Sequence, residues 1–113
     1  MKRISTHILD LTHGKPASEV PVRLEWQESP GHWRALKSER TDQDGRCGQL
    51  LPGTELAAGL YRLVFDTASY FSRLKVAGLY PVVEVTFEVR DGESQFHILL
   101  LLSANGYTTY RGS

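Results

Sequence analysis

Two histidines have the residue type and the setting for acid-base chemistry. His7 lies in the first predicted β-strand, on the same side as Ser5 and Leu9. His97 lies in a late predicted strand. An unperturbed imidazole titrates near pH ~6.5, so either ring could exchange a proton with a bound molecule close to neutral pH. A histidine on a strand face is more often structural than catalytic, so the residues alone leave both interpretations open.

Arg46 follows directly after a predicted turn, Asp44-Gly45. Its guanidinium carries a planar fork of N–H donors, which suits oxygen atoms that gain negative charge in a reaction. The plainer interpretation is a surface arginine paired with Asp42 or Asp44, an interaction worth less than ~1 kcal/mol. Arg46 is therefore a candidate binding residue whose role the residues alone leave open.

Cys47 is the single cysteine of the chain, which excludes an intrachain disulfide. A reactive thiol needs a nearby cation and partial exposure, whereas a free cysteine is commonly a small buried residue. We therefore interpret Cys47 as structural. His13 and His32 lie in turn-like contexts with polar neighbours, and for them too a structural role is the plainer interpretation.

The sequence lacks the standard patterns for a metal site, a phosphate site or a nucleophilic serine. A zinc site built on His7 and His97 would need a third ligand, and no spacing in the sequence supplies one. There is no Gly-rich phosphate loop, no G-x-S-x-G motif and no Cys-x-x-Cys pair. We expect no metal and no organic cofactor.

The composition is that of an ordinary globular protein. The 113 residues suit a single domain spanning 1–113, with 41% apolar and 23% charged residues. Lysine plus arginine equals aspartate plus glutamate, 13 against 13, which argues against nucleic-acid binding and polybasic membrane binding. The longest apolar run, residues 98–102, is far too short to span a membrane, and Asp10 follows too soon for a signal peptide. We expect a cytoplasmic protein.

Hydrophobic alternation with a period of two predicts an all-β protein, because that period places one face of a strand in a core. The predicted strands are Ile4–Asp10, Val20–Gln27, Trp33–Thr41, Arg46–Leu50, Leu60–Asp66, Val82–Val89, Phe96–Ser103 and Tyr107–Arg111. Turn signals separate them at His13-Gly14-Lys15-Pro16, Asp44-Gly45, Pro52-Gly53, Asp91-Gly92 and Asn105-Gly106. Eight short strands with frequent turns are typical of a β-sandwich.

Two segments depart from this pattern. Residues 67–76 predict one short helix, capped by Asp66 or Thr67 and ended by Gly78. Residues 95–113 carry a single permanent charge, that of Arg111. A terminal strand pair with so little charge predicts an interface between copies of the chain.

Both ends of the chain resemble the signatures of the transthyretin-like family. The match begins with residues 5–10 and His13-Gly14-Lys15-Pro16-Ala17, and it closes with residues 107–113. Residues 41–46, 59–63 and Tyr80-Pro81 match between them. The closing Tyr-Arg-Gly-Ser marks the enzymatic branch of that family, the 5-hydroxyisourate hydrolases, and vertebrate transthyretins lack it.

The resemblance implies a fold, an assembly and an activity. The fold is an eight-stranded transthyretin-like (prealbumin-like) β-sandwich with a short helix after the fifth strand. The assembly is a homotetramer, a dimer of dimers, with active sites in the channel between the dimers. The activity is hydrolysis of 5-hydroxyisourate to 2-oxo-4-hydroxy-4-carboxy-5-ureidoimidazoline in urate degradation, without a cofactor.

The resemblance also implies which residues act. His7, Arg46 and His97 match the positions of catalytic residues, and Tyr110 and Ser113 match the residues expected to reach the substrate. One histidine would take a proton from water, the other would hydrogen-bond or protonate the ring, and which does which stays open. Family members commonly have proline where this chain has Leu99 and Ala104, a departure that concerns hairpin shape.

Two other functions remain in competition. The same sandwich could be a carrier that holds a small aromatic ligand without reaction, because a fold does not determine a function. It could also be an interaction domain with no small-molecule site. The two strand histidines, Arg46 and the closing tetrapeptide favour the enzyme, since a carrier of apolar ligands has no use for them.

Overall fold

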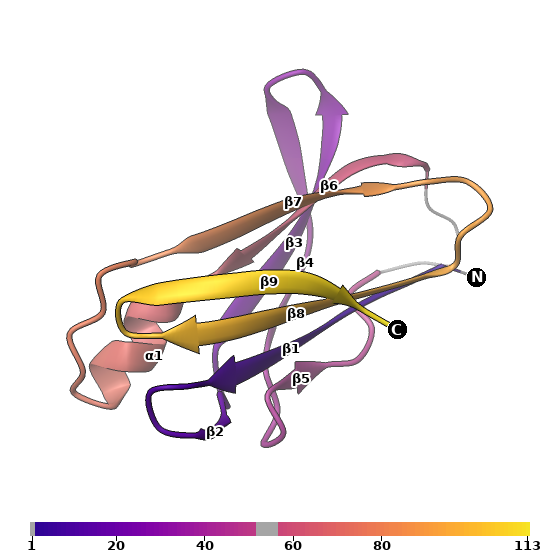
Figure 1. Cartoon of the computed structure of the whole chain (residues 1–113). Coiled ribbons are helices and arrows are strands. Elements are labelled where there is room, and N and C mark those ends of the chain that lie inside the picture. The colour runs from indigo at the N-terminus through magenta and orange to yellow at the C-terminus, as the bar shows by residue number, and fades with distance from the viewer. Residues whose placement is uncertain (1, 52–56) are drawn as a thin grey trace.

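Alternating apolar side chains hold two β-sheets face to face in the computed structural model, which describes residues 2–51 and 57–113. Figure 1 shows the two layers, with the single described helix at one end. One sheet consists of β1 (Arg3–Asp10), β2 (Lys15–Pro16), β5 (Arg46–Cys47), β8 (Gln95–Ser103) and β9 (Gly106–Gly112). The other has the order β4 (His32–Arg40), β3 (Pro21–Ser29), β6 (Gly59–Phe65), β7 (Val83–Val89). The helix α1 (Thr67–Arg73) connects β6 to β7.

The first sheet joins the beginning of the chain to its last two strands. β1 runs parallel to β8, with Arg3 opposite Gln95 and Asp10 opposite Leu102. β9 is antiparallel to β8 on its far side, while β5 and β2 pair with the other edge of β1. Residues some ninety positions apart in sequence are therefore neighbours on one surface.

The core lies between the sheets, as the alternation predicts. Tyr61, Leu63 and Phe65 of β6 are fully buried on the inner side. Ile4, Thr6 and Ile8 of β1 are fully buried too, whereas Ser5, His7 and Leu9, which alternate with them, are half-buried. The outer face of the first sheet thus carries leucines as well as the polar side chains of the candidate site.

The predicted sandwich is confirmed, and the short elements differ from prediction. Lys15–Pro16, expected within a turn, pairs with Asp10 and Leu9 as the two-residue strand β2. β5 keeps only Arg46–Cys47 of the longer strand expected there. The hairpin turn between β3 and β4, at Gly31, was not predicted. The expected turn at Pro52-Gly53 lies outside the described residues.

The helix begins where predicted and ends earlier. Asp66 caps it by accepting the backbone N–H of Ser69 at 3.0 Å. The expected end at Gly78 is wrong, because Lys75 already turns into the left-handed region with φ 60°. The N–H of Val76 then closes the end on the carbonyl of Phe71. No helix in residues 2–51 and 57–113 is long and apolar enough to cross a membrane.

Candidate active site

Strand register brings the three predicted catalytic residues to one face of the first sheet. His7 lies opposite Arg46 in the β1–β5 pair. His97 lies opposite Ser5, two residues before His7, in the β1–β8 pair. Side chains two apart on a strand share a face, so all four lie on the outer side of the sheet. The ring centroids of His7 and His97 are 6.5 Å apart.

A tight turn fixes the backbone of Arg46. One carboxylate oxygen of Asp42 accepts the N–H of Asp44 at 2.9 Å and that of Arg46 at 3.0 Å. Gly45 has φ 76°, and a Cβ there would collide with the carbonyl oxygen of Ile8. The turn therefore depends on the carboxylate of Asp42 and on glycine at position 45, and it delivers Arg46 beside His7.

The imidazole of His97 is fixed on two sides. Its Nδ1 lies 2.8 Å from Oγ of Ser5. On the other side Gly112 lies opposite it in the β8–β9 pair, and a Cβ on residue 112 would be 2.8 Å from Cδ2 of the ring. The ring therefore lies between the hydroxyl of Ser5 and the backbone of Gly112, which has no side chain.

A hollow of about 290 Å³ lies against these residues, and we call it the histidine hollow. Its lining includes Arg3, Ser5, Arg46, His97 and Ser113. His7 does not line it. A neighbouring hollow of about 360 Å³ is also lined by His97 and Ser113.

The closing residues of the chain divide between the two faces of β9. Ser113, a predicted substrate-binding residue, lines the histidine hollow. Tyr110 lies on the outer face opposite Leu99 but lines neither hollow. The guanidinium of Arg111 is used elsewhere, on the carboxylate of Glu93 at 2.7 Å and over the ring of Phe96.

The electrostatics of the site favour a neutral imidazole at His97. Partial burial lowers the pKa of His97, and the neighbouring His7, Arg46 and Arg3 lower it further. The ring therefore keeps a free lone pair at pH values where an ordinary histidine is partly protonated. That is the form a general base needs.

Cys47 is among the residues that line the histidine hollow, but its surroundings do not favour a reactive thiol. Burial, with Glu39 and Asp42 nearby, raises the pKa of the Cys47 thiol to about 12, so the thiolate is not formed near neutral pH. The interpretation of Cys47 as structural fits its nearly complete burial. His32 is exposed at the start of β4 in the other sheet.

His13 is exposed and belongs to a separate polar cluster around Asp10, the last residue of β1. The carboxylate of Asp10, which is fully buried, accepts the Tyr70 hydroxyl at 2.6 Å and lies 2.7 Å from Nδ1 of His13. Burial opposes ionisation of Asp10, but the hydrogen bonds from Tyr70 and His13 outweigh it and lower the pKa of Asp10. This cluster ties the loop after β1 to α1.

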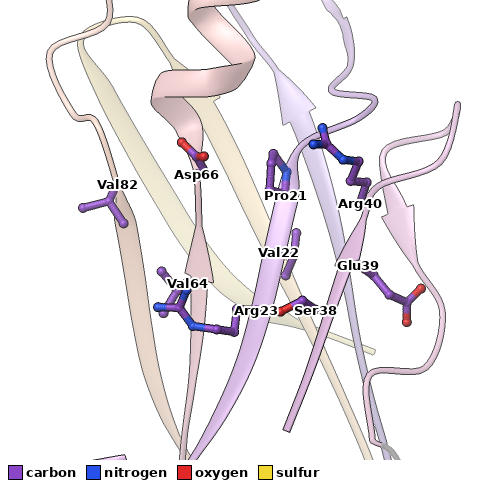
Figure 2. A pocket seen from close by; sticks show the side chains of 9 residues that line it. All are labelled: Pro21, Val22, Arg23, Ser38, Glu39, Arg40, Val64, Asp66 and Val82. Atoms are coloured by element: carbon purple, nitrogen blue, oxygen red, sulfur yellow. The ribbon is translucent and has the colours of Figure 1, made fainter. Parts of the chain in front are cut away.

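A larger depression, of about 560 Å³, lies on the outer face of the other sheet (Figure 2). Figure 2 shows Arg23 of β3 lying alongside Val64 of β6, with Val82 across from them. Two of its polar groups have internal partners: Arg23 bonds to Glu25 at 2.7 Å, and Asp66 caps α1. None of the predicted site residues lies there, so the histidine hollow is the candidate site.

Reasoning from sequence missed two residues of the site, Arg3 and Ser5. Nε of Arg3 donates to the carbonyl of Gly48 at 2.7 Å, which holds this second cation at the hollow. Ser5 was placed on the same side of its strand as His7, but only the parallel β1–β8 pairing shows that it meets His97. In the described part of the chain no three His, Cys, Asp or Glu residues are grouped to hold a metal ion.

Comparison with known proteins finds similarity along nearly the whole chain. The model of the HIUase/Transthyretin family matches residues 4–112. The 5-hydroxyisourate hydrolase of Salmonella typhimurium is 44% identical over 110 residues, which cover 97% of this chain and 80% of that protein.

Two solved structures have the same fold. Klebsiella pneumoniae 5-hydroxyisourate hydrolase aligns with a TM-score of 0.87 at 33% identity, over 100% of both chains. Transthyretin from Sparus aurata aligns with a TM-score of 0.91 at 29% identity, over 99% of this chain and 97% of that one. The expected fold is thereby confirmed, while fold similarity alone does not separate a hydrolase from a carrier.

Proposed function

The chain belongs to the HIUase/transthyretin family, and from that premise we propose that it hydrolyses 5-hydroxyisourate in urate degradation. The observation that carries the proposal is one hollow that holds Arg46, His97 and Ser113, with His7 beside His97. The names of its relatives support the same substrate.

The proposed reaction opens a ring amide with water. The water oxygen bonds to the carbonyl carbon, the carbon–nitrogen bond breaks, and the nitrogen takes up a proton. The product is 2-oxo-4-hydroxy-4-carboxy-5-ureidoimidazoline. Such a reaction needs a base for water, donors for the carbonyl oxygen as it becomes an oxyanion, and an acid for the leaving nitrogen.

His97 suits the role of the base. Its lowered pKa keeps the ring neutral, and Nδ1 is engaged with Ser5, which leaves Nε2 for the water molecule. His7, beside it on the same face, is then the group that hydrogen-bonds the substrate and donates its own proton to the leaving nitrogen. The proton that His97 takes from water passes to solvent, and His7 takes up a proton from solvent before the next turnover.

Arg46 suits the role of the oxyanion donor. The turn at Asp42 and Gly45 fixes its backbone, so little reorganisation is needed when charge develops on the carbonyl oxygen. Ser113 lines the hollow and orients the substrate, and Tyr110, on the outer face of β9, bounds its approach. Water addition to an amide exchanges no electrons, so these residues suffice without a cofactor.

We also propose a homotetramer, a dimer of dimers. β7 and β9 are the last strands of their sheets, and exposed aliphatic and aromatic side chains gather beside them. These are Leu79, Tyr80, Val82, Tyr107 and Tyr110, with Tyr80 and Tyr107 in edge-to-face contact. Sedimentation equilibrium tests the assembly: the mass of four chains is expected, and the mass of one chain overturns it.

A carrier of small ligands is the second candidate, favoured by the close match to Sparus aurata transthyretin. The polar and titratable lining of the histidine hollow speaks against it, because an apolar ligand would leave those groups unsolvated and unpaired.

A coupled ultraviolet assay separates the two functions. Urate and urate oxidase generate 5-hydroxyisourate in the cuvette, and the decay of its absorbance is followed after the protein is added. We expect faster decay with the wild type and the spontaneous rate with Arg46→Ala. Decay at the spontaneous rate with well-folded wild type would overturn the hydrolase proposal and leave the carrier as the remaining candidate.

A further inference from the structure

The contact between Ser5 and His97 joins the first strand of the chain to a strand ninety residues later. Oγ of Ser5 lies 2.8 Å from Nδ1 of His97, and the two residues are direct partners in the parallel β1–β8 pair. Both side chains are half-buried on the outer face. A hydrogen bond at this distance and degree of burial is well formed and partly shielded from water.

An imidazole on a strand has two orientations that differ by a half-turn of the ring. The half-turn exchanges Nδ1 with Cδ2 and so changes which nitrogen faces a ligand. The observed orientation gives Nδ1 the hydroxyl of Ser5 and places Cδ2 against Gly112, where no side chain offers a partner. The opposite orientation would leave Nδ1 facing Gly112 and forfeit that bond.

We propose that Ser5 is a positioning residue for His97: its hydroxyl oxygen accepts the Nδ1–H of the neutral ring and thereby presents the Nε2 lone pair to the histidine hollow. The catalytic consequence of this role rests on the proposed hydrolase function. The orientation and tautomer of the His97 ring do not depend on that function, because they are properties of the folded protein.

A neutral hydroxyl fits this position better than a carboxylate would. His7, Arg46 and Arg3 surround the ring with positive or potentially positive charge, which disfavours the imidazolium. A carboxylate at residue 5 would stabilise the imidazolium and remove the lone pair from the neutral pH range. Serine orients the ring without adding charge, so the base stays available.

The test compares three variants in two measurements. Ser5→Ala removes the hydroxyl, Ser5→Thr keeps it on a residue that favours strands, and Ser103→Ala is the matched control. Ser103 is a half-buried serine on the outer face at the other end of β8, and it bonds to the carbonyl of Gly106. The measurements are steady-state kinetics and the ¹⁵N chemical shifts of the His97 ring.

We expect Ser5→Ala to lower kcat about tenfold with KM little changed, the loss of one orienting hydrogen bond. Ser5→Thr and Ser103→Ala should keep the wild-type kcat. The ¹⁵N shifts should show the Nδ1–H tautomer in the wild type and in Ser5→Thr, and a mixture of tautomers in Ser5→Ala.

The two measurements separate failure of this inference from failure of the proposed function. A wild type with the Nε2–H tautomer, or a Ser5→Ala ring with unchanged shifts, overturns the positioning role whatever the activity. The expected shifts in a protein without hydrolase activity would support the positioning role and overturn the proposed function instead. If Ser5→Ala loses kcat and Ser5→Thr does not restore it, that result would also count against the positioning role.

Discussion

Gly112 faces His97 across the β8–β9 pair so closely that residue 112 has no room for a side chain. A Cβ there would lie 2.8 Å from Cδ2 of the His97 ring and 2.5 Å from a methyl carbon of Leu99. Gly112→Ala should therefore displace the imidazole and lower turnover roughly 10²-fold, the cost of misplacing a catalytic group by about an ångström.

Gly106→Ala is the control for that variant. Gly106 lies at the other end of the same strand, and its added Cβ would have no neighbour closer than 3.9 Å. Turnover of Gly106→Ala should match the wild type in the coupled assay. Equal turnover of Gly112→Ala and Gly106→Ala would contradict the prediction that a Cβ at residue 112 displaces the His97 ring.

Replacing Arg46 tests whether the fork of donors matters or only the charge. Arg46→Ala should lose roughly 10²-fold or more in kcat/KM, since it removes the proposed oxyanion donors. Arg46→Lys should also be poor, because an ammonium does not reproduce the planar fork. Arg40→Ala, an exposed arginine of the other sheet, should have no effect. Wild-type kinetics in Arg46→Lys would show that a point charge is enough.

With His97 as the proposed base, its lowered pKa should set the acid limb of the pH profile. Because the ordinary value of 6.5 is lowered in the folded protein, the ring stays neutral below pH 6.5 and the activity should persist there. Arg3→Gln removes one of the nearby cations, so the His97 pKa should rise and the acid limb should move toward higher pH. A pH–kcat series with an NMR titration of His97 measures both. An acid limb that Arg3→Gln leaves in place, or moves downward, would contradict this account.

Asp10 should govern stability rather than catalysis. Its folded-state pKa lies below the ordinary 3.8, so its contribution is complete above pH 3.8 and is lost as the pH falls through the lowered value. Asp10→Asn should lower the free energy of unfolding by about 1–3 kcal/mol, since it weakens two hydrogen bonds of a buried acceptor. Urea unfolding at pH 7 and pH 3 measures this, with kcat at 25 °C as the check on the site. A large loss of kcat in a folded Asp10→Asn protein would place the cluster in the mechanism.

Cys47 should be dispensable for the chemistry and resistant to alkylation. Its pKa of about 12 leaves almost no thiolate at neutral pH, and its side chain is nearly fully buried. Iodoacetamide at pH 7 should leave the folded protein unlabelled and fully active, and urea should expose the thiol to labelling. Inactivation of the folded protein in proportion to labelling would restore the nucleophile interpretation.

The strands with a clean alternation were predictable because burial leaves its period in the sequence. The inner residues of β6, Tyr61, Leu63 and Phe65, were identified correctly, as were those of β7. The two-residue strand β2 was not, since so short a segment carries no period. The helix end also escaped prediction, because Lys75 adopts a backbone conformation that favours glycine.

The placement of His7 and Arg46 follows from local rules, a strand and an Asp-Gly turn. Their meeting with His97 does not, because the parallel pairing of β1 with β8 leaves no local signal in either strand. The resemblance of the chain to a known family is what linked His97 to His7 and Arg46, which the alternation pattern could not do. Ser5 and Arg3 lie outside the residues which that resemblance assigned, and only the register places them at the hollow.

The parallel pairing of β1 with β8 also sets the order of events during synthesis. Ser5 and His97 are separated by 92 positions, so a ribosome adding ~5–20 residues per second exposes β1 for about 5–20 s before its partner emerges. During that interval only β2 and β5 can pair with β1, so the edge of β1 that β8 later occupies stays unpaired. Long-range pairing of this kind also raises contact order and slows folding. The histidine hollow is therefore incomplete until β8 and the residues after it have emerged, and until then β1 keeps an unpaired strand edge of the kind that promotes aggregation.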